Sequence, residues 1–209
     1  MHNIEYITTS VGEACVTWHP SHSEVRAILT LGHGTATGVE AADLQALAKA
    51  LPARGITVAL VEQPYRVMGD PRLSGPRILD TVWRDLWPQL ESAQLPLVAG
   101  GRSAGSQVAC RTARDLGALA VLALSYPLNG PGHAAELLGT GVPTLVVQGG
   151  NDPFGRPAQF PALPSTMELV EIPHADHMFN VPNDRESALE LLTTAVGNWL
   201  DLRLSSVAA

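Results

Sequence analysis

A serine between two glycines carries the clearest chemical signal in this chain. Ser103 lies in the segment Gly101-Arg102-Ser103-Ala104-Gly105, directly after the apolar run 95–99. A G-x-S-x-G order after a strand is typical of a sharp strand-to-helix turn, because only small residues fit two positions to either side of the exposed serine. The pattern predicts a nucleophilic serine, and the alternative is an ordinary turn.

A serine nucleophile needs a base to accept its proton and a carboxylate to orient that base. Two of the seven histidines, His174 and His177, fall in the loop after the predicted strand 167–172. We expect His177 to be the base because it lies deeper in this loop, just before the last predicted helix, and His174 is the alternative. Asp152 follows the apolar run 142–148, where the acid of a Ser, Asp, His chain order is expected. An aspartate before proline is also a common turn residue.

Acyl transfer also requires N–H donors for the developing oxyanion. We expect the backbone N–H of Ala104, at the start of the helix after the serine, and that of Thr35, in the glycine-rich segment 31–38. This segment lacks the Gly-Lys-Ser/Thr ending of a phosphate-binding loop. His33 within it is interpreted as a loop brace rather than a second base. Asp176 is interpreted as a residue that organises its loop rather than as the acid.

Two charged residues border the predicted site. Arg102 precedes the serine and is a candidate to face the cleft, where it would favour substrates that carry a carboxylate or phosphate. A salt bridge at the sheet edge is an equally good interpretation. Glu62 ends a predicted strand and is a candidate to contact Arg102 or substrate, and a solvated loop carboxylate is the alternative.

The elements that must position these residues alternate between strand-like and helical patterns. This alternation predicts an α/β fold, with a mostly parallel sheet covered by helices on both faces. The predicted strands are an antiparallel hairpin at 4–8 and 14–18, followed by 27–31, 56–61, 95–100, 119–124, 142–148 and 167–172. The predicted helices are 39–53, 76–94, 104–116 and 184–202. Pro88 predicts a kink or an early end in the second helix.

Composition narrows the classes of function. The 209 residues are 45% hydrophobic and 16% charged, and no linker-like segment divides them, so we expect a single domain over 1–209. A net charge of -7 without a basic run argues against nucleic-acid binding. The N-terminal residues do not show a basic segment followed by an apolar one, as a signal peptide would, and no apolar run is long enough to span a membrane. We therefore expect a cytoplasmic protein without a membrane partner.

The sequence also gives no sign of a metal or cofactor. Cys15 and Cys110 are too few for a disulfide framework and lie in no metal-ligand spacing. Both are interpreted as buried apolar groups. We therefore expect no metal and no cofactor.

Four separated segments together resemble the α/β-hydrolase superfamily over nearly the whole chain. They are the His33-Gly34 loop, the 101–105 turn, Asp152 and His177. The segments 62–65, 101–106, 124–128 and 148–155 resemble, more narrowly, the small hydrolase-like domain of testis-expressed proteins and of a chromatin acetyltransferase complex subunit. Dienelactone-hydrolase-like proteins are the next most similar group, but they use a cysteine where Ser103 stands, so their reaction is not carried over.

The resemblance implies an α/β-hydrolase fold with an eight-stranded type of core and no large cap domain. It implies an open site in which Ser103 attacks an ester-type carbonyl of a small molecule, His177 shuttles the proton and Asp152 orients His177. Two other functions are compatible with the sequence. One is a binding or scaffolding domain that retains the fold without its chemistry. The other is an acyltransferase that uses the same three residues.

Overall fold

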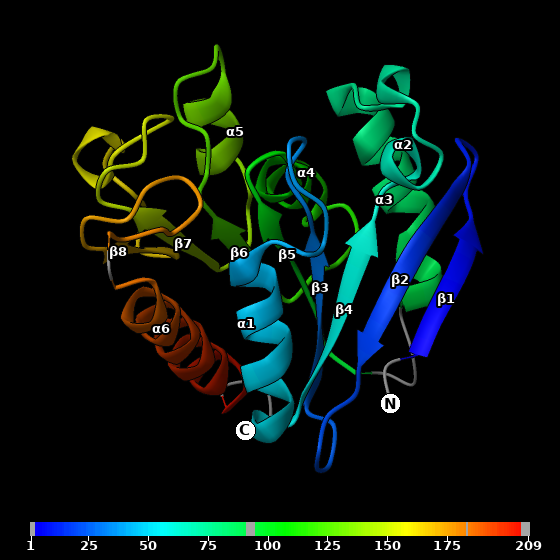
Figure 1. The fold of residues 1–209 in the computed structure, drawn as a ribbon, viewed down its shortest axis with the longest axis horizontal. Helices are drawn as coiled ribbons and strands as arrows, with labels where there is room; N and C mark the ends of the chain where they lie inside the picture. Colours follow the sequence, from blue (N-terminus) through cyan, green and yellow to red (C-terminus); the bar gives the residue numbers. More distant parts are fainter. Residues whose placement is uncertain (1–2, 91–94, 183, 206–209) are drawn as a thin grey trace.

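An eight-stranded sheet forms the centre of the computed structural model, which describes residues 3–90, 95–182 and 184–205 (Figure 1). The strand order across the sheet is β1-β2-β4-β3-β5-β6-β7-β8. The strands are β1 (Asn3–Thr8), β2 (Glu13–His19), β3 (Ala27–Gly32), β4 (Ile56–Glu62), β5 (Leu97–Arg102), β6 (Ala120–Leu124), β7 (Thr144–Gly149) and β8 (Met167–Ile172).

The strands β3 to β8 are parallel, and β1 and β2 form an antiparallel hairpin that joins the sheet at β4. Every residue of β3, β5, β6 and β7 is buried. Helices on both faces of a parallel sheet exclude water from it, which explains why these strands are continuous apolar runs. The predicted hairpin and the predicted parallel strands are confirmed.

Helices cover both faces of the sheet (Figure 1). One face carries α1 (Ala42–Ala50) and α6 (Arg185–Ser205), which pack against each other. The other face carries α3 (Pro76–Leu90) and α4 (Ala104–Thr112), and α5 (His133–Leu138) packs on α4. The short helix α2 (Pro64–Val67) follows β4. None of the helices in the described residues has the length and apolar character needed to cross a bilayer.

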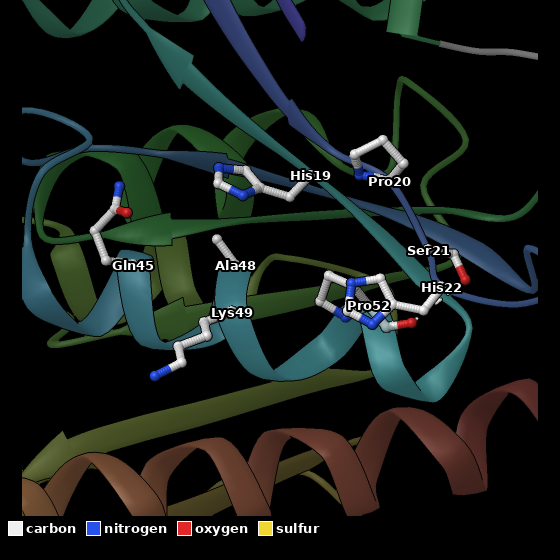
Figure 2. Close-up of a pocket in the computed structure, with 8 residues that line it drawn as sticks. All are labelled: His19, Pro20, Ser21, His22, Gln45, Ala48, Lys49 and Pro52. Atoms are coloured by element: carbon white, nitrogen blue, oxygen red, sulfur yellow. Dashed lines mark hydrogen bonds between the residues drawn. The ribbon is translucent and has the colours of Figure 1, made fainter. Parts of the chain in front are cut away.

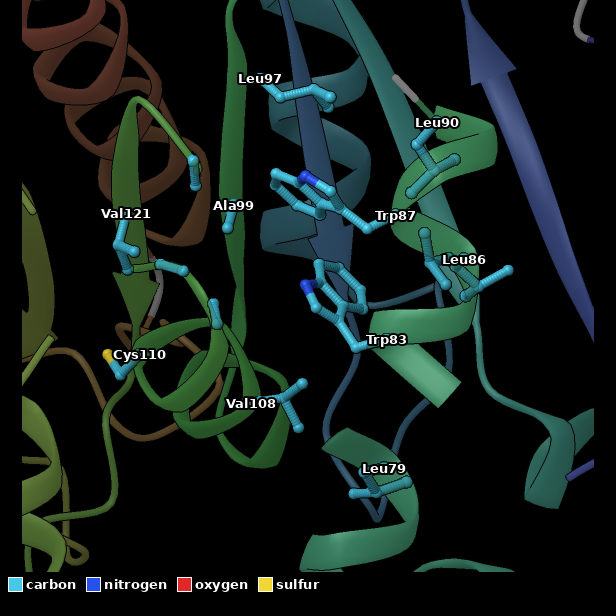
Figure 3. Close-up of a cluster of buried hydrophobic side chains, with 14 of the residues drawn as sticks. Leu79, Trp83, Leu86, Trp87, Leu90, Leu97, Ala99, Val108, Cys110 and Val121 are labelled. Atoms are coloured by element: carbon cyan, nitrogen blue, oxygen red, sulfur yellow. The ribbon is translucent and has the colours of Figure 1, made fainter. Parts of the chain in front are cut away.

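Helix α3 shows how periodicity builds the core. Its buried residues follow helical spacing: Leu79, Val82, Trp83, Leu86, Trp87 and Leu90. The two tryptophan rings point from α3 toward the sheet (Figure 3), and Trp83 is only 1% exposed. The helix continues through Pro88 to Leu90 instead of ending before the proline. The last four residues of the predicted helix, 91–94, lie outside the described residues.

Several boundaries differ from the prediction. Helix α1 starts at Ala42 rather than residue 39. A 3-10 turn, Leu51–Arg54, follows it and is capped by Gly55, whose φ of 78° is left-handed. Helix α4 ends at Thr112, four residues early. Helices α2 and α5 were not predicted, because four to six residues are too few to show helical periodicity.

Candidate active site

Ser103 occupies the turn between β5 and α4 in a strained backbone conformation. Its φ of 51° and ψ of -120° are unusual for a residue with a side chain. A Cβ atom added at Gly101 would lie 2.6 Å from the carbonyl carbon of Gly105, and one added at Gly105 would lie 2.5 Å from the carbonyl oxygen of Gly32. Both glycines are therefore required for the close packing of this turn against β3.

Ser103, His177 and Asp152 form a continuous hydrogen-bonded chain. The Oγ atom of Ser103 lies 3.1 Å from Nε2 of His177, and Nδ1 of His177 lies 2.8 Å from Oδ2 of Asp152. An ionised carboxylate only accepts hydrogen bonds, so Nδ1 carries the proton and Nε2 is left to accept from the serine hydroxyl. The side chain of Asp152 is fully buried, whereas that of His177 is 15% exposed.

Gln148 holds Asp152 in place, and the sequence analysis did not identify this role. The Nε2 atom of Gln148 donates to Oδ2 of Asp152 at 2.9 Å and to the carbonyl of Gly155 at 2.7 Å. The backbone N–H of Phe154 donates to Oδ1 of Asp152 at 2.8 Å. The signal in the sequence was the polar side chain of Gln148 at the end of the apolar run 145–147. An amide buried at that position must be hydrogen-bonded to a neighbouring group.

The two predicted oxyanion donors lie beside the serine. Ala104 is the first residue of α4, where backbone N–H groups have no partner within the helix. Thr35 is exposed in the loop after β3, and both residues line one cleft together with Ser103. A Cβ atom added at Gly34 would lie 3.2 Å from Cβ of Ser103, so this loop packs directly against the serine.

His33 braces the loop that carries Thr35, as the sequence analysis proposed. The backbone N–H of Gln63 donates to Nε2 of His33 at 3.0 Å, so Nδ1 carries the ring proton and donates to the carbonyl of Gly34 at 2.8 Å. The hydroxyl of Tyr65 also donates to that carbonyl at 3.1 Å. Burial lowers the pKa of His33 below its ordinary value, which favours the neutral ring.

Arg102 does not face the cleft, and the salt-bridge interpretation describes it better. Its side chain is 2% exposed, and its Nε donates to Oδ2 of Asp43, itself 1% exposed, at 3.0 Å. Its Nη1 donates to Oγ1 of Thr37, and its Nη2 donates to the carbonyl of His177, both at 2.8 Å. One buried guanidinium thus joins α1, the loop after β3 and the loop of His177.

Glu62 does not contact Arg102. Its half-buried carboxylate pairs instead with Arg66, one turn further on, at 3.2 Å. Cys110 is buried, and burial raises the pKa of its thiol to about 12, whereas Cys15 is only partly buried, contrary to the interpretation of both as buried groups.

Asp176 organises the loop of His177. Its carboxylate accepts the backbone N–H groups of Met178 and Asn180 at 2.8 and 2.9 Å. Burial raises the pKa of Asp176, but the hydrogen bonds from Asn180 and Met178 outweigh this and bring its pKa below the ordinary value. The side chain of His174 is exposed, and His174 lines a hollow that includes neither Ser103 nor His177.

The cleft at Ser103 has a volume of about 510 Å³. Its apolar lining includes Leu79, Pro127 and Phe154, and the Phe154 ring centroid lies 4.6 Å from that of His177. Farther along α4 the lining becomes polar and includes Gln107 and Arg111.

A second hollow, of about 580 Å³, lies between the end of β2 and helix α1. Figure 2 shows the residues that line it. His19, His22 and Lys49 line it together with apolar groups. Since His19 pairs with Val58 early in β4, this hollow lies toward the opposite end of the parallel strands from Ser103. Among the described residues, no cluster of three or more histidine, cysteine or acidic side chains is arranged to hold a metal ion.

Comparison with known proteins agrees with this architecture. The model of a family described as an alpha/beta hydrolase domain matches residues 25–199. No curated protein is significantly similar to the chain.

Among solved structures, XC6422 from Xanthomonas campestris, described as an a/b serine hydrolase without a lid, is 18% identical with a TM-score of 0.71, covering 95% of this chain and 94% of that one. Dienelactone hydrolase from Anabaena variabilis is 19% identical with a TM-score of 0.77, and the match covers 95% of this chain and 96% of that one. Est1E from Butyrivibrio proteoclasticus with bound ferulic acid is 16% identical with a TM-score of 0.81, and the match covers 96% of this chain and 99% of that one. These likenesses show the lidless α/β fold, a single sheet covered by helices on both faces.

Proposed function

Because the chain belongs to the alpha/beta hydrolase domain family, we propose that it is a serine hydrolase that cleaves carboxylic esters of small molecules through an acyl-enzyme. The observation that carries this proposal is the hydrogen-bonded chain from Asp152 through His177 to Ser103 at the wall of a cleft. The serine hydrolase XC6422 and Est1E, which was solved with bound ferulic acid, share the fold, and this supports the assignment without identifying a substrate.

In the proposed reaction, Nε2 of His177 accepts the hydroxyl proton as Oγ of Ser103 attacks the ester carbonyl. The carboxylate of Asp152 holds the imidazole in the required tautomer and stabilises the imidazolium that forms. The N–H groups of Ala104 and Thr35 stabilise the oxyanion, and each such donor contributes about 3 kcal/mol to transition-state stabilisation. His177 then protonates the leaving alcohol, and water releases the acyl group by the reverse sequence.

We further propose that the chain is related to the small hydrolase-like domains of testis-expressed proteins and of a chromatin acetyltransferase complex subunit, on the four segments that resemble them. We also propose that residues 1–209 form one domain, since no linker-like segment divides them, and that this domain acts in the cytoplasm on a small-molecule substrate.

Replacement of Ser103 tests the assignment. We expect Ser103→Ala to reduce hydrolysis of a short-chain 4-nitrophenyl ester by about 10⁴-fold or more, because the three residues act as a unit. His177→Ala should cause a loss of similar size, and His174→Ala provides the matched control from the same loop, with activity unchanged.

Labelling with a fluorophosphonate probe separates the alternatives. A folded wild-type protein that the probe never labels at Ser103 would indicate a scaffolding domain. Labelling together with product formation only when an alcohol or thiol acceptor is added would indicate an acyltransferase.

A further inference from the structure

The second hollow, between the end of β2 and helix α1, has walls from two parts of the chain. One wall is the segment 19–22, which begins with the last residue of β2. The other wall is one face of α1 and of the turn after it, and its residues are three or four positions apart: Gln45, Ala48, Lys49 and Pro52. Figure 2 shows the two walls on opposite sides of the space, which we call the Lys49 hollow. Its volume of about 580 Å³ is in the range of small-molecule sites.

Backbone hydrogen bonds hold the first wall in place. The N–H of His22 donates to the carbonyl of Pro52, in the opposite wall, at 2.9 Å. The N–H of Ser21 donates to Oγ1 of Thr57, in β4, at 3.1 Å. Ala48 and Pro52 are themselves buried. The fold therefore fixes the shape of the hollow, and little conformational entropy is lost from the protein when a ligand binds there.

The lining of the Lys49 hollow contains basic side chains and no acidic ones. The whole chain has seven histidines and a single lysine, and His19, His22 and Lys49 all line this space. No aspartate or glutamate is among the described residues that line it, although the net charge of the chain is -7. In the part of the chain that the structure describes, the exposed Lys49 side chain forms no ion pair. Its ammonium group is therefore available to an anion.

The other lining groups narrow the kind of anion. Pro20, Ala48 and Pro52 offer an apolar surface, which suits a ligand with a hydrocarbon body. The ammonium of a lysine is a compact single charge and suits a monoanion. A phosphate group is typically bound by an arginine fork or by several free backbone N–H groups. No arginine is among the described lining residues, and the N–H groups of Ser21 and His22 are already hydrogen-bonded.

From this arrangement we propose that the Lys49 hollow binds small organic monocarboxylates, with the carboxylate on Lys49 and the apolar body against the two prolines. The imidazole of His22, exposed at the rim, supplies a further hydrogen-bond donor. The hollow lies toward the opposite end of the parallel strands from Ser103. The site is therefore separate from the proposed hydrolytic centre, and binding there does not depend on that function.

Two matched ligands, 2-naphthoate and 2-naphthamide, test this site because they have the same shape and differ in charge. We expect the wild-type protein to bind 2-naphthoate at least fivefold more tightly in isothermal titration calorimetry at pH 7.5, since charge-assisted hydrogen bonds are the stronger ones. Lys49→Gln should abolish this preference, whereas Lys49→Arg should keep most of it because the positive charge remains. Equal affinities in the wild-type protein, or an undiminished preference in Lys49→Gln, would overturn the proposal.

Arg84→Gln is the matched control. Arg84 pairs with Asp115 on the protein surface, is 43% exposed and does not line the hollow, yet its replacement changes the net charge by the same amount as Lys49→Gln. It should leave the preference for 2-naphthoate unchanged. A loss of preference as large as in Lys49→Gln would mean that net charge, rather than this site, selects the carboxylate, and would refute the proposal. Thermal melting of each variant verifies that it remains folded.

Chemical modification locates the bound ligand, because Lys49 is the single lysine of the chain. Reductive methylation with formaldehyde, followed by mass spectrometry of the peptide that contains Lys49, measures how accessible its amine is. Saturating 2-naphthoate should slow methylation of Lys49 at least threefold relative to the protein without ligand. An unchanged rate at saturation would place the ligand elsewhere, such as the Ser103 cleft, and would contradict the proposal whether or not the protein hydrolyses esters.

Discussion

Two arginines nine residues apart show how burial decides what an ion pair does. Arg102 is sealed in the protein with one carboxylate, Asp43, and its remaining donors reach neutral oxygens of two loops. Arg111 lies partly exposed in the cleft wall with an excess of carboxylates. In the first region the guanidinium has no route to substrate and can only hold the loops around the nucleophile. In the second, the guanidinium itself lines the cleft that a substrate would occupy, whereas its two carboxylate partners, Asp80 and Glu136, do not.

The largest effect should follow from Arg102→Met, which leaves the Asp43 carboxylate buried without its partner. Removing one member of a buried pair costs about 3 to 5 kcal/mol of unfolding free energy. We also expect kcat to fall by about 10²-fold, because the loops of His177 and Thr37 lose their shared donor. Denaturant unfolding and ester hydrolysis measure the two effects, and a variant with unchanged kcat would show that Arg102 has no positioning role.

The double variant Arg102→Met with Asp43→Leu separates stability from positioning. Removing both charges eliminates the unpaired carboxylate, so the unfolding free energy should recover to within about 1 kcal/mol of the wild-type value. We expect kcat to stay low with KM little changed, because an apolar pair cannot donate to the carbonyl of His177. Full recovery of kcat in the double variant would mean that the pair serves stability alone.

Arg111→Met should have a smaller effect on folding and on short substrates. Its partners are partly exposed, so we expect a loss of about 1 kcal/mol in unfolding free energy. Hydrolysis of 4-nitrophenyl acetate should stay within about threefold of wild type, since an acetyl group does not reach two helical turns along α4. A 10²-fold loss with acetate would contradict the distinction between the two arginines.

The smallest expected effect is a dependence of stability on pH through His33, which belongs to the buried region. Its pKa is lowered by burial in the folded state, so the unfolded chain takes up the proton first as pH falls. The stability present above about pH 6.5 should therefore decrease as pH falls below that value. Unfolding measured at pH 7.5 and pH 5 should show this loss, and His33→Gln should show less of it. An identical pH slope in both proteins would refute the prediction.

Much of the fold could be predicted from the sequence because its signals are local. The apolar runs at β3 to β7 identify buried parallel strands, and the glycines around Ser103 identify the sharp turn. Boundaries were less predictable where competing preferences meet. Helix α3 passes through Pro88 because the buried tryptophan face stabilises its last turns. The short helices α2 and α5 show no periodicity in the sequence, and their formation depends on packing against β2 and α4, respectively.

The sequence by itself determined the residue types of the candidate site and their chain order, because turn chemistry and strand periodicity act over a few residues. Only the tertiary structure brought Ser103 within hydrogen-bonding distance of His177, 74 residues away, and placed Gln148 behind Asp152. Tertiary packing also decided that Arg102 points inward to Asp43 and that Arg111 lines the cleft. The physical reason is that a charged side chain takes its orientation from distant partners, which no local pattern encodes.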